Sequence, residues 1–226
     1  MLKPRKRLVK AKLKEDKLLT FTAKFQVFIS RYRRYLMYGA AAVVVIGVLG
    51  IVTLWSKANA RKQAAFVELL ARDAYARSDL DETLTQVNII LEDFPGTRAA
   101  AQALMLKGRV YEQRGDLDEA ARLFQQVIDD YRDQTYLASG AFNALGAIYY
   151  GRGDWVEAAR YYLEGANRYP THFNTPENLL EAGRCLKKAR RYDQARQALR
   201  KVITDYPKSD SVAKARSELE EIEFMP

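Results

Sequence analysis

A pattern of about 37 residues recurs four times in this chain and limits strongly what it can fold into. The four blocks begin at Ala64, Ala101, Ser139 and Pro176, so their offsets are 37, 38 and 37 residues. In each block, apolar residues at helical spacing form two segments separated by a short turn. One such helix pair cannot bury its apolar face alone, so consecutive pairs must stack. The repeat therefore predicts an all-α protein built as an α-solenoid of about four helix pairs.

Small and aromatic residues recur at fixed places within the blocks. The second block has Gly108, Tyr111, Gly115, Ala120 and Phe124, and the third has Gly146, Tyr149, Gly153, Ala158 and Tyr162. Small residues let two helices approach closely, and a glycine after the first helix can adopt the left-handed conformation that ends it. The third and fourth blocks close with Tyr169-Pro170 and Tyr206-Pro207, where proline stops the second helix.

This signature resembles the tetratricopeptide repeat (TPR) over about residues 64–207. The individual repeats lie near 64–97, 101–134, 139–172 and 176–209. Two positions depart from the pattern, since Arg132 replaces the closing proline of the second block and Arg190 replaces the turn glycine of the fourth. The period also exceeds the usual repeat of about 34 residues, which predicts longer turns.

The residues after the last repeat, 208–226, predict a helix with one apolar stripe. That stripe consists of Val212, Ala215, Leu219 and Ile222, and charged residues occupy the other faces. A helix of this kind closes the exposed end of a solenoid. We therefore expect a TPR domain over 57–207, followed by a capping helix and tail.

The stretch Tyr35–Ser56 contains no charged residue and predicts a transmembrane helix. At about 1.5 Å per residue it would extend about 33 Å, enough to cross a hydrocarbon core about 30 Å thick. A cleaved signal peptide is the alternative, because Ala58-Asn59-Ala60 offers a small-x-small cleavage pattern. The basic leader and the apolar run are both longer than those of typical signal peptides, which favours an uncleaved anchor.

Positive charge is concentrated ahead of the apolar stretch. Residues 1–34 hold 12 Lys and Arg against 2 acidic residues, whereas the remainder holds 25 basic and 26 acidic ones. The positive-inside tendency predicts a cytoplasmic N-terminus and an extracytoplasmic TPR domain. We expect the leader to carry a juxtamembrane amphipathic helix and to be attracted to anionic lipid headgroups. No nucleic-acid partner is expected, because the leader contains no recognisable nucleic-acid-binding module.

The residues that usually carry catalysis or bind metals are sparse. Cys185 is the only cysteine and His172 the only histidine, and their separation fits neither a zinc site nor a catalytic triad. We therefore expect no catalytic, metal or cofactor site and no cofactor.

The TPR resemblance implies that the first helices of the repeats line a groove for a peptide. Carried onto this chain, the groove positions are Glu68, Arg72, Met105, Arg109, Glu112, Asn143, Tyr150, Arg184 and Lys187. Their mixture of basic, aromatic and apolar side chains suits an extended or helical peptide with some acidic character.

A basic leader, one span and a short TPR array together resemble the membrane-anchored periplasmic TPR proteins that accompany the Sec translocon of bacteria. The resemblance implies a non-enzymatic scaffold in the inner membrane that binds proteins of the cell envelope and assists export or envelope assembly. Two alternatives remain: an N-anchored organelle import receptor with cytosolic repeats, and a regulatory subunit of a membrane enzyme complex.

Overall fold

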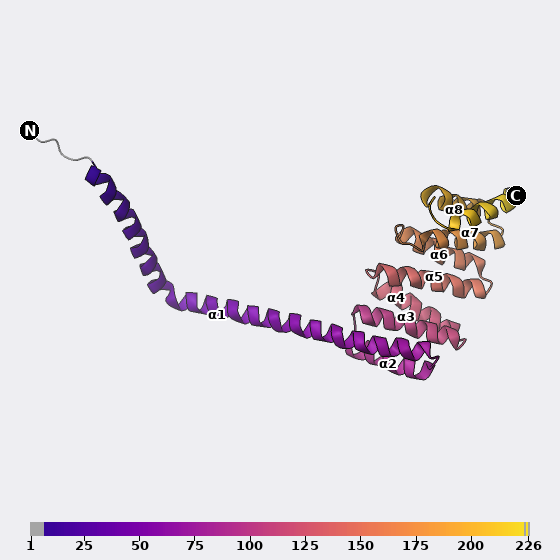
Figure 1. The fold of residues 1–226 in the computed structure, drawn as a ribbon, viewed down its shortest axis with the longest axis horizontal. Helices are drawn as coiled ribbons and strands as arrows, with labels where there is room; N and C mark the ends of the chain where they lie inside the picture. The colour runs from indigo at the N-terminus through magenta and orange to yellow at the C-terminus, as the bar shows by residue number, and fades with distance from the viewer. Residues whose placement is uncertain (1–6, 224, 226) are drawn as a thin grey trace, which may run out of the picture. The chain divides into compact units, whose positions relative to one another are not determined.

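The computed structural model describes residues 7–223 and 225, which form nine α-helices and no strand (Figure 1). The first six residues of the basic leader lie outside the described residues. The chain divides into two compact units, Met1–Ala58 and Asn59–Pro226. An all-helical solenoid, as expected from the repeat, is confirmed.

Helix α1 (Arg7–Ala76) contains the whole apolar stretch Tyr35–Ser56. Among the described residues, the part of α1 over Lys24–Ala76 is the one helical stretch that is long and apolar enough to cross a membrane. A signal sequence near an N-terminus meets the same criteria of length and composition. None of the side chains in its most apolar window is buried by the protein.

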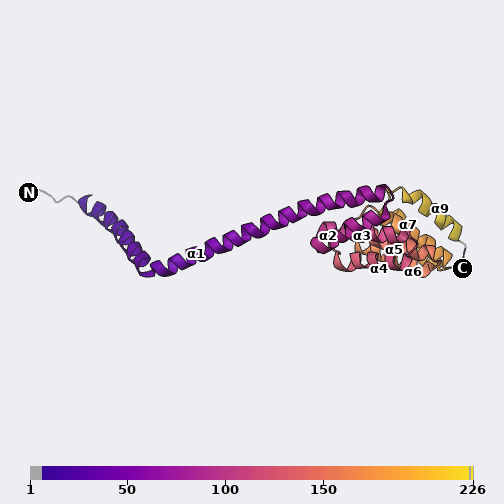
Figure 2. The ribbon, with the colours of Figure 1, turned by 90° about the horizontal axis from the view of Figure 1, so that it is seen from below.

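The second unit is a stack of helix pairs in chain order. Residues 59–76 of α1 pair with α2 (Leu80–Asp93), and α3 (Arg98–Gln113) pairs with α4 (Leu117–Asp130). The next two pairs are α5 (Thr135–Gly151) with α6 (Trp155–Arg168), and α7 (Thr175–Lys188) with α8 (Tyr192–Asp205). Helix α9 (Ser211–Ile222) packs on α7 and α8 at the end of the stack (Figure 2).

The turn inside each pair has the same backbone geometry. A left-handed residue ends the first helix four times, at Ser78 (φ 60°), Gly115 (φ 82°), Gly153 (φ 78°) and Arg190 (φ 57°). Arg190 thus adopts the conformation of the glycine that it replaces. In the first three pairs an aspartate follows directly and caps the second helix: Asp79, Asp116 and Asp154 accept hydrogen bonds from the backbone N–H groups of Glu82, Glu119 and Glu157.

Tyrosines at the ends of the second helices tie neighbouring repeats together. The hydroxyl of Tyr169 donates to the carbonyl of Arg132 over 3.0 Å, and that of Tyr206 donates to the carbonyl of Pro170 over 2.7 Å. The backbone N–H of Gly96 donates to the hydroxyl of Tyr131 over 3.3 Å. The tyrosine at the end of the second, third and fourth repeats therefore fixes the spacing to the repeat before it, even where Arg132 stands in place of proline.

Candidate protein-binding groove

The first helices of the first three repeats surround one cleft with a volume of about 420 Å³. Its lining comes from α1, α3 and α5, with single residues from α2 and from the residue before α7. The lining residues are Glu68, Ala71, Arg72, Tyr75, Ile90, Gln102, Ala103, Met105, Leu106, Arg109, Tyr136, Leu137, Gly140, Asn143 and Asn174.

The floor of the cleft is apolar. Ala71, Ile90 and Ala103 are buried in the core between the first two repeats, so the backbone beneath the cleft cannot shift freely. Met105 is also largely buried, and a Cβ at Gly140 would lie 3.5 Å from its terminal methyl group. A flexible thioether beside a glycine gives the floor a surface that can adapt to an apolar side chain.

Charge in the cleft is net positive, because it contains two arginines and one glutamate. Arg72 forms an ion pair with Glu68 one helical turn earlier, with 2.7 Å between Nη2 and Oε1. Arg109, on α3, is exposed at the rim of the same cleft. A partly neutralised Arg72 and an exposed Arg109 favour a partner that carries a carboxylate.

Amide and aromatic side chains form the wall contributed by the third repeat. Asn143 donates from Nδ2 to Oδ1 of the fully buried Asn178 over 2.8 Å, which fixes the orientation of its amide. Tyr136 lies at the other end of this wall and contacts the rings of His172 and Phe173. Burial lowers the pKa of His172, so its imidazole ring is uncharged at neutral pH.

The structure places the predicted groove residues in two groups. Glu68, Arg72, Met105, Arg109 and Asn143 line the cleft together. Glu112, Tyr150, Arg184 and Lys187 do not line it. Glu112 is exposed on α3, while the other three make specific contacts elsewhere.

Tyr150 belongs to a small aromatic cluster at the end of α5. Its ring packs edge-on against Trp155, with 4.9 Å between the ring centroids. The ammonium group of Lys188 lies 4.8 Å from the centroid of the Trp155 ring and 5.5 Å from that of Tyr150. Cation–π contacts of this kind hold the cluster together, so Tyr150 already has partners within the chain.

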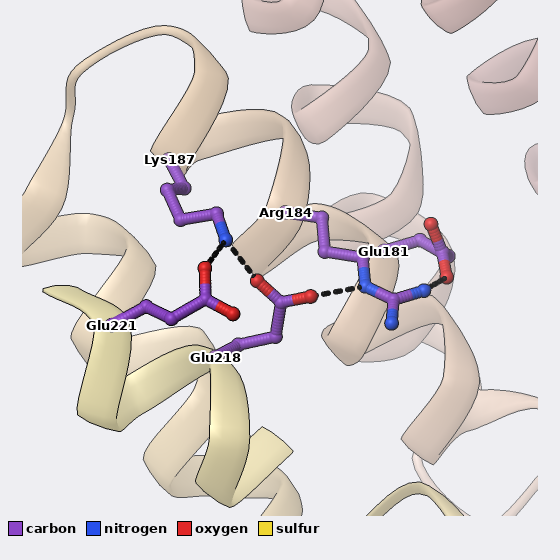
Figure 3. A network of polar contacts seen from close by, with 5 residues as sticks. All are labelled: Glu181, Arg184, Lys187, Glu218 and Glu221. Carbon is purple, nitrogen blue, oxygen red and sulfur yellow. Dashed lines mark hydrogen bonds and ion pairs between the residues drawn. The ribbon is translucent and has the colours of Figure 1, made fainter. Parts of the chain in front are cut away.

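Arg184 and Lys187 are held by the last helix (Figure 3). The Nε of Arg184 donates to Glu218 on α9 over 2.8 Å, and Lys187 donates to both Glu218 and Glu221. Burial alone would raise the pKa of Glu218, but the hydrogen bonds and charges of Lys187 and Arg184 outweigh it and lower that pKa. The cleft is therefore confined to the first three repeats, and α9 covers the equivalent basic positions of the fourth.

Ten of the fifteen lining residues were not among the predicted groove positions, and Tyr75, Tyr136 and Asn174 are the polar or aromatic ones that most change the chemistry of the cleft. Tyr136 and Asn174 lie at the starts of α5 and α7, outside the helix segments that define the repeat. Tyr75 lies three residues beyond Arg72 on α1, so helical spacing alone could have indicated it.

Comparison with protein families agrees with this geometry. Models of the tetratricopeptide repeat match residues 68–135 and 114–172, and a further tetratricopeptide-repeat model matches residues 177–209. These matches together cover more than half of the chain and span all four helix pairs. The chain belongs to the tetratricopeptide-repeat family. No curated protein sequence matches it.

Solved structures share the fold at low sequence identity. A tetratricopeptide repeat protein from Parabacteroides merdae ATCC 43184 is 17% identical, with a TM-score of 0.57, over 72% of this chain and 60% of that one. MamA protein is 15% identical, with a TM-score of 0.51, over 71% of this chain and 84% of that one. The nearly identical TPR-like repeats of a protein described as a kinesin light chain, from Podosopora anserina, are 16% identical, with a TM-score of 0.54, over 71% and 85%.

TPR families are generally non-enzymatic scaffolds that bind proteins. Within the described residues, no three His, Cys, Asp or Glu side chains gather in a way that could hold a metal ion. The cleft offers an apolar floor, two guanidinium groups and the oriented amide of Asn143.

Proposed function

We propose that this TPR protein is a non-enzymatic, membrane-anchored scaffold that binds a protein partner of the bacterial cell envelope in the cleft between α1, α3 and α5. The observation that carries the proposal is the combination of a shaped apolar floor with the basic rim formed by Arg72 and Arg109. Both features suit a peptide segment that presents an apolar side chain beside a carboxylate.

The apolar stretch Tyr35–Ser56 supports anchoring, and the excess of basic residues ahead of it supports a cytoplasmic N-terminus. In this arrangement the TPR domain lies outside the cytoplasm, at the inner membrane. A role in export or envelope assembly rests on the resemblance to the Sec-associated TPR proteins, and the low-identity structural matches supply the fold alone.

Partner binding can be tested by photocrosslinking in intact bacteria. A photoreactive residue at Arg109 is expected to capture a discrete protein, whereas the same residue at Arg122 is not. Arg122 is a matched control because it is an exposed arginine on the second helix α4, outside the cleft. Capture from position 109 should be lost in an Arg72→Glu background and retained in an Arg122→Glu background. Equal capture from both positions would contradict the groove.

Topology needs a separate experiment. A cysteine introduced at Ser217, an exposed position on α9, should react with a membrane-impermeant maleimide once the outer membrane is permeabilised. The buried Cys185 of the unaltered chain gives the background. Reaction only after the inner membrane is lysed would place the TPR domain in the cytoplasm and overturn the proposed orientation.

A further inference from the structure

The outer face of the first helix pair is apolar and exposed. Phe66 and Leu69 on α1 are 62% and 63% exposed, and Leu70 on α1 and Ile89 on α2 are 39% and 37% exposed. Phe66 and Leu70 are one helical turn apart and share a side of α1. A groove of about 440 Å³ lies between α1 and α2 at this face. Its lining residues are Lys62, Gln63, Phe66, Val67, Ile89, Asp93 and Phe94.

The opposite end of the stack is built differently. There α9 buries Ala215 and Ile222 against the array and exposes charged residues, among them Lys214, Arg216 and Glu220. A solenoid needs a polar outer face at each end to remain soluble. Helix α9 provides that face at one end, whereas no helix of residues 59–223 covers Phe66 and Ile89 at the other.

We propose that the face is covered by the same face of a second copy of this chain, in a two-fold symmetric dimer in which α1 of each copy packs against α2 of the other. Charge complementarity selects this occupant. Lys62 on α1 and Asp93 on α2 lie at the same end of the groove, because the two helices run in opposite directions. A two-fold axis along the helices places Lys62 of each copy opposite Asp93 of the other, and Phe66 opposite Ile89.

Parallel packing of the two α1 helices against each other is less favourable. If the two α1 helices packed side by side in parallel, Lys62 would meet Lys62, and like charges would be brought together. With α1 against α2 of the second copy, two opposite-charge pairs lie side by side at one end of the interface, next to a shared apolar centre. Both chains also enter this dimer from the same end, as two anchors in one membrane require. Only this last point rests on the anchoring proposed above.

Disulfide trapping of the full-length chain in native membranes tests the arrangement. Two differently tagged chains are co-expressed, one carrying Lys62→Cys and the other Asp93→Cys. The chain without an added cysteine is the control, since its single thiol at Cys185 is buried. A disulfide that joins the two tags is expected. The absence of this product, or disulfides only between two Lys62→Cys chains, would overturn the proposal.

Charge reversal supplies an independent test, read as the protein mass of the full chain in detergent by light scattering. Lys62→Asp alone and Asp93→Lys alone should each convert the dimer to monomer, and the double variant should restore the dimer. Phe66→Glu should give a monomer, whereas the matched control Lys214→Asp on α9 should remain a dimer.

A dimer that survives Phe66→Glu, or a wild-type monomer whose face instead contacts lipid or another protein, would refute the proposed dimer. Capture from position 109, measured in the Phe66→Glu variant, keeps a failure of the dimer distinct from a failure of the groove.

Discussion

Gly108 on α3 lies directly against the ring of Phe124 on α4, and a Cβ added at Gly108 would sit 2.6 Å from Cε1 of that ring. Equivalent contacts recur in the following repeats. A Cβ at Gly146 would meet the Tyr162 ring at 2.7 Å, and one at Gly183 would meet Leu199 at 2.6 Å. In the second, third and fourth repeats, helix packing therefore requires glycine at this place.

Gly108→Ala is expected to destabilise the fold by about 1–3 kcal/mol, because the Phe124 ring is fully buried and cannot move aside. This cost exceeds the gain of about 1 kcal/mol in helix propensity that alanine brings. A urea titration that follows the far-ultraviolet circular dichroism of the full chain measures the change. Gly151→Ala is the matched control, since nothing lies within 4 Å of a Cβ there, and it should be neutral or stabilising. Equal stability of the two variants would contradict the packing argument.

Arg190→Gly is expected to stabilise the protein by about 0.5–1 kcal/mol. Arg190 has a φ of 57°, which costs an L-residue about 1–2 kcal/mol, and glycine adopts this conformation without that strain. Part of the gain is offset, since glycine loses more conformational freedom on folding. The same urea titration reports the change. Gly115→Ala, at the equivalent position of the second repeat (φ 82°), should shift stability in the opposite direction, and a gain there would contradict the interpretation.

The repeat made much of the array predictable from sequence. The offsets of 37 and 38 residues between the blocks predict where each turn lies. The structure has a left-handed residue at the turn positions Gly115, Gly153 and Arg190. These features are local, because a turn or a close helix approach depends on residues within one repeat.

The limits of the cleft were less predictable, because they depend on contacts between repeats. Glu218 is 34 residues from Arg184, and nothing in the sequence around Arg184 indicates that a helix beyond the last repeat neutralises it. Likewise, Tyr136 and Asn174 enter the cleft from helix starts whose position relative to α1 and α3 depends on the stacking of the whole array.

The thiol of Cys185 is expected to be unreactive in the folded protein. It is fully buried in α7, and burial raises its pKa to about 12, so almost no thiolate is present at neutral pH. Reaction with a maleimide at pH 7 should proceed only in urea, at the rate at which the fourth repeat opens. A cysteine introduced at the exposed Arg190 is the control and should react at once without urea. Rapid labelling of Cys185 in buffer would show that this repeat opens readily.

The contact between α9 and α7 is expected to weaken in acid. Arg184 and Lys187 lower the pKa of Glu218 below its ordinary value of 4.5, which means that the folded state favours the ionised form. The ion pairs therefore stabilise the fold fully above that ordinary value, and their contribution is lost as the pH falls through the lower folded pKa. Since the Glu218 side chain is only 14% exposed, solvent screens these pairs weakly, and Glu218→Gln should cost about 1–2 kcal/mol at pH 7.

Hydrogen exchange of the α9 amides, expressed as protection relative to the unfolded chain, measures this effect. In the wild type, protection of α9 should fall below pH 4.5 while that of α5 and α6 persists. Glu218→Gln should lower α9 protection already at pH 7 and flatten its dependence on pH. Glu220→Gln, one of the exposed positions on the same helix, is the matched control and should behave as the wild type. If Glu218→Gln and the wild type were protected equally at pH 7, apolar packing of Ala215 and Ile222 alone would hold α9 in place.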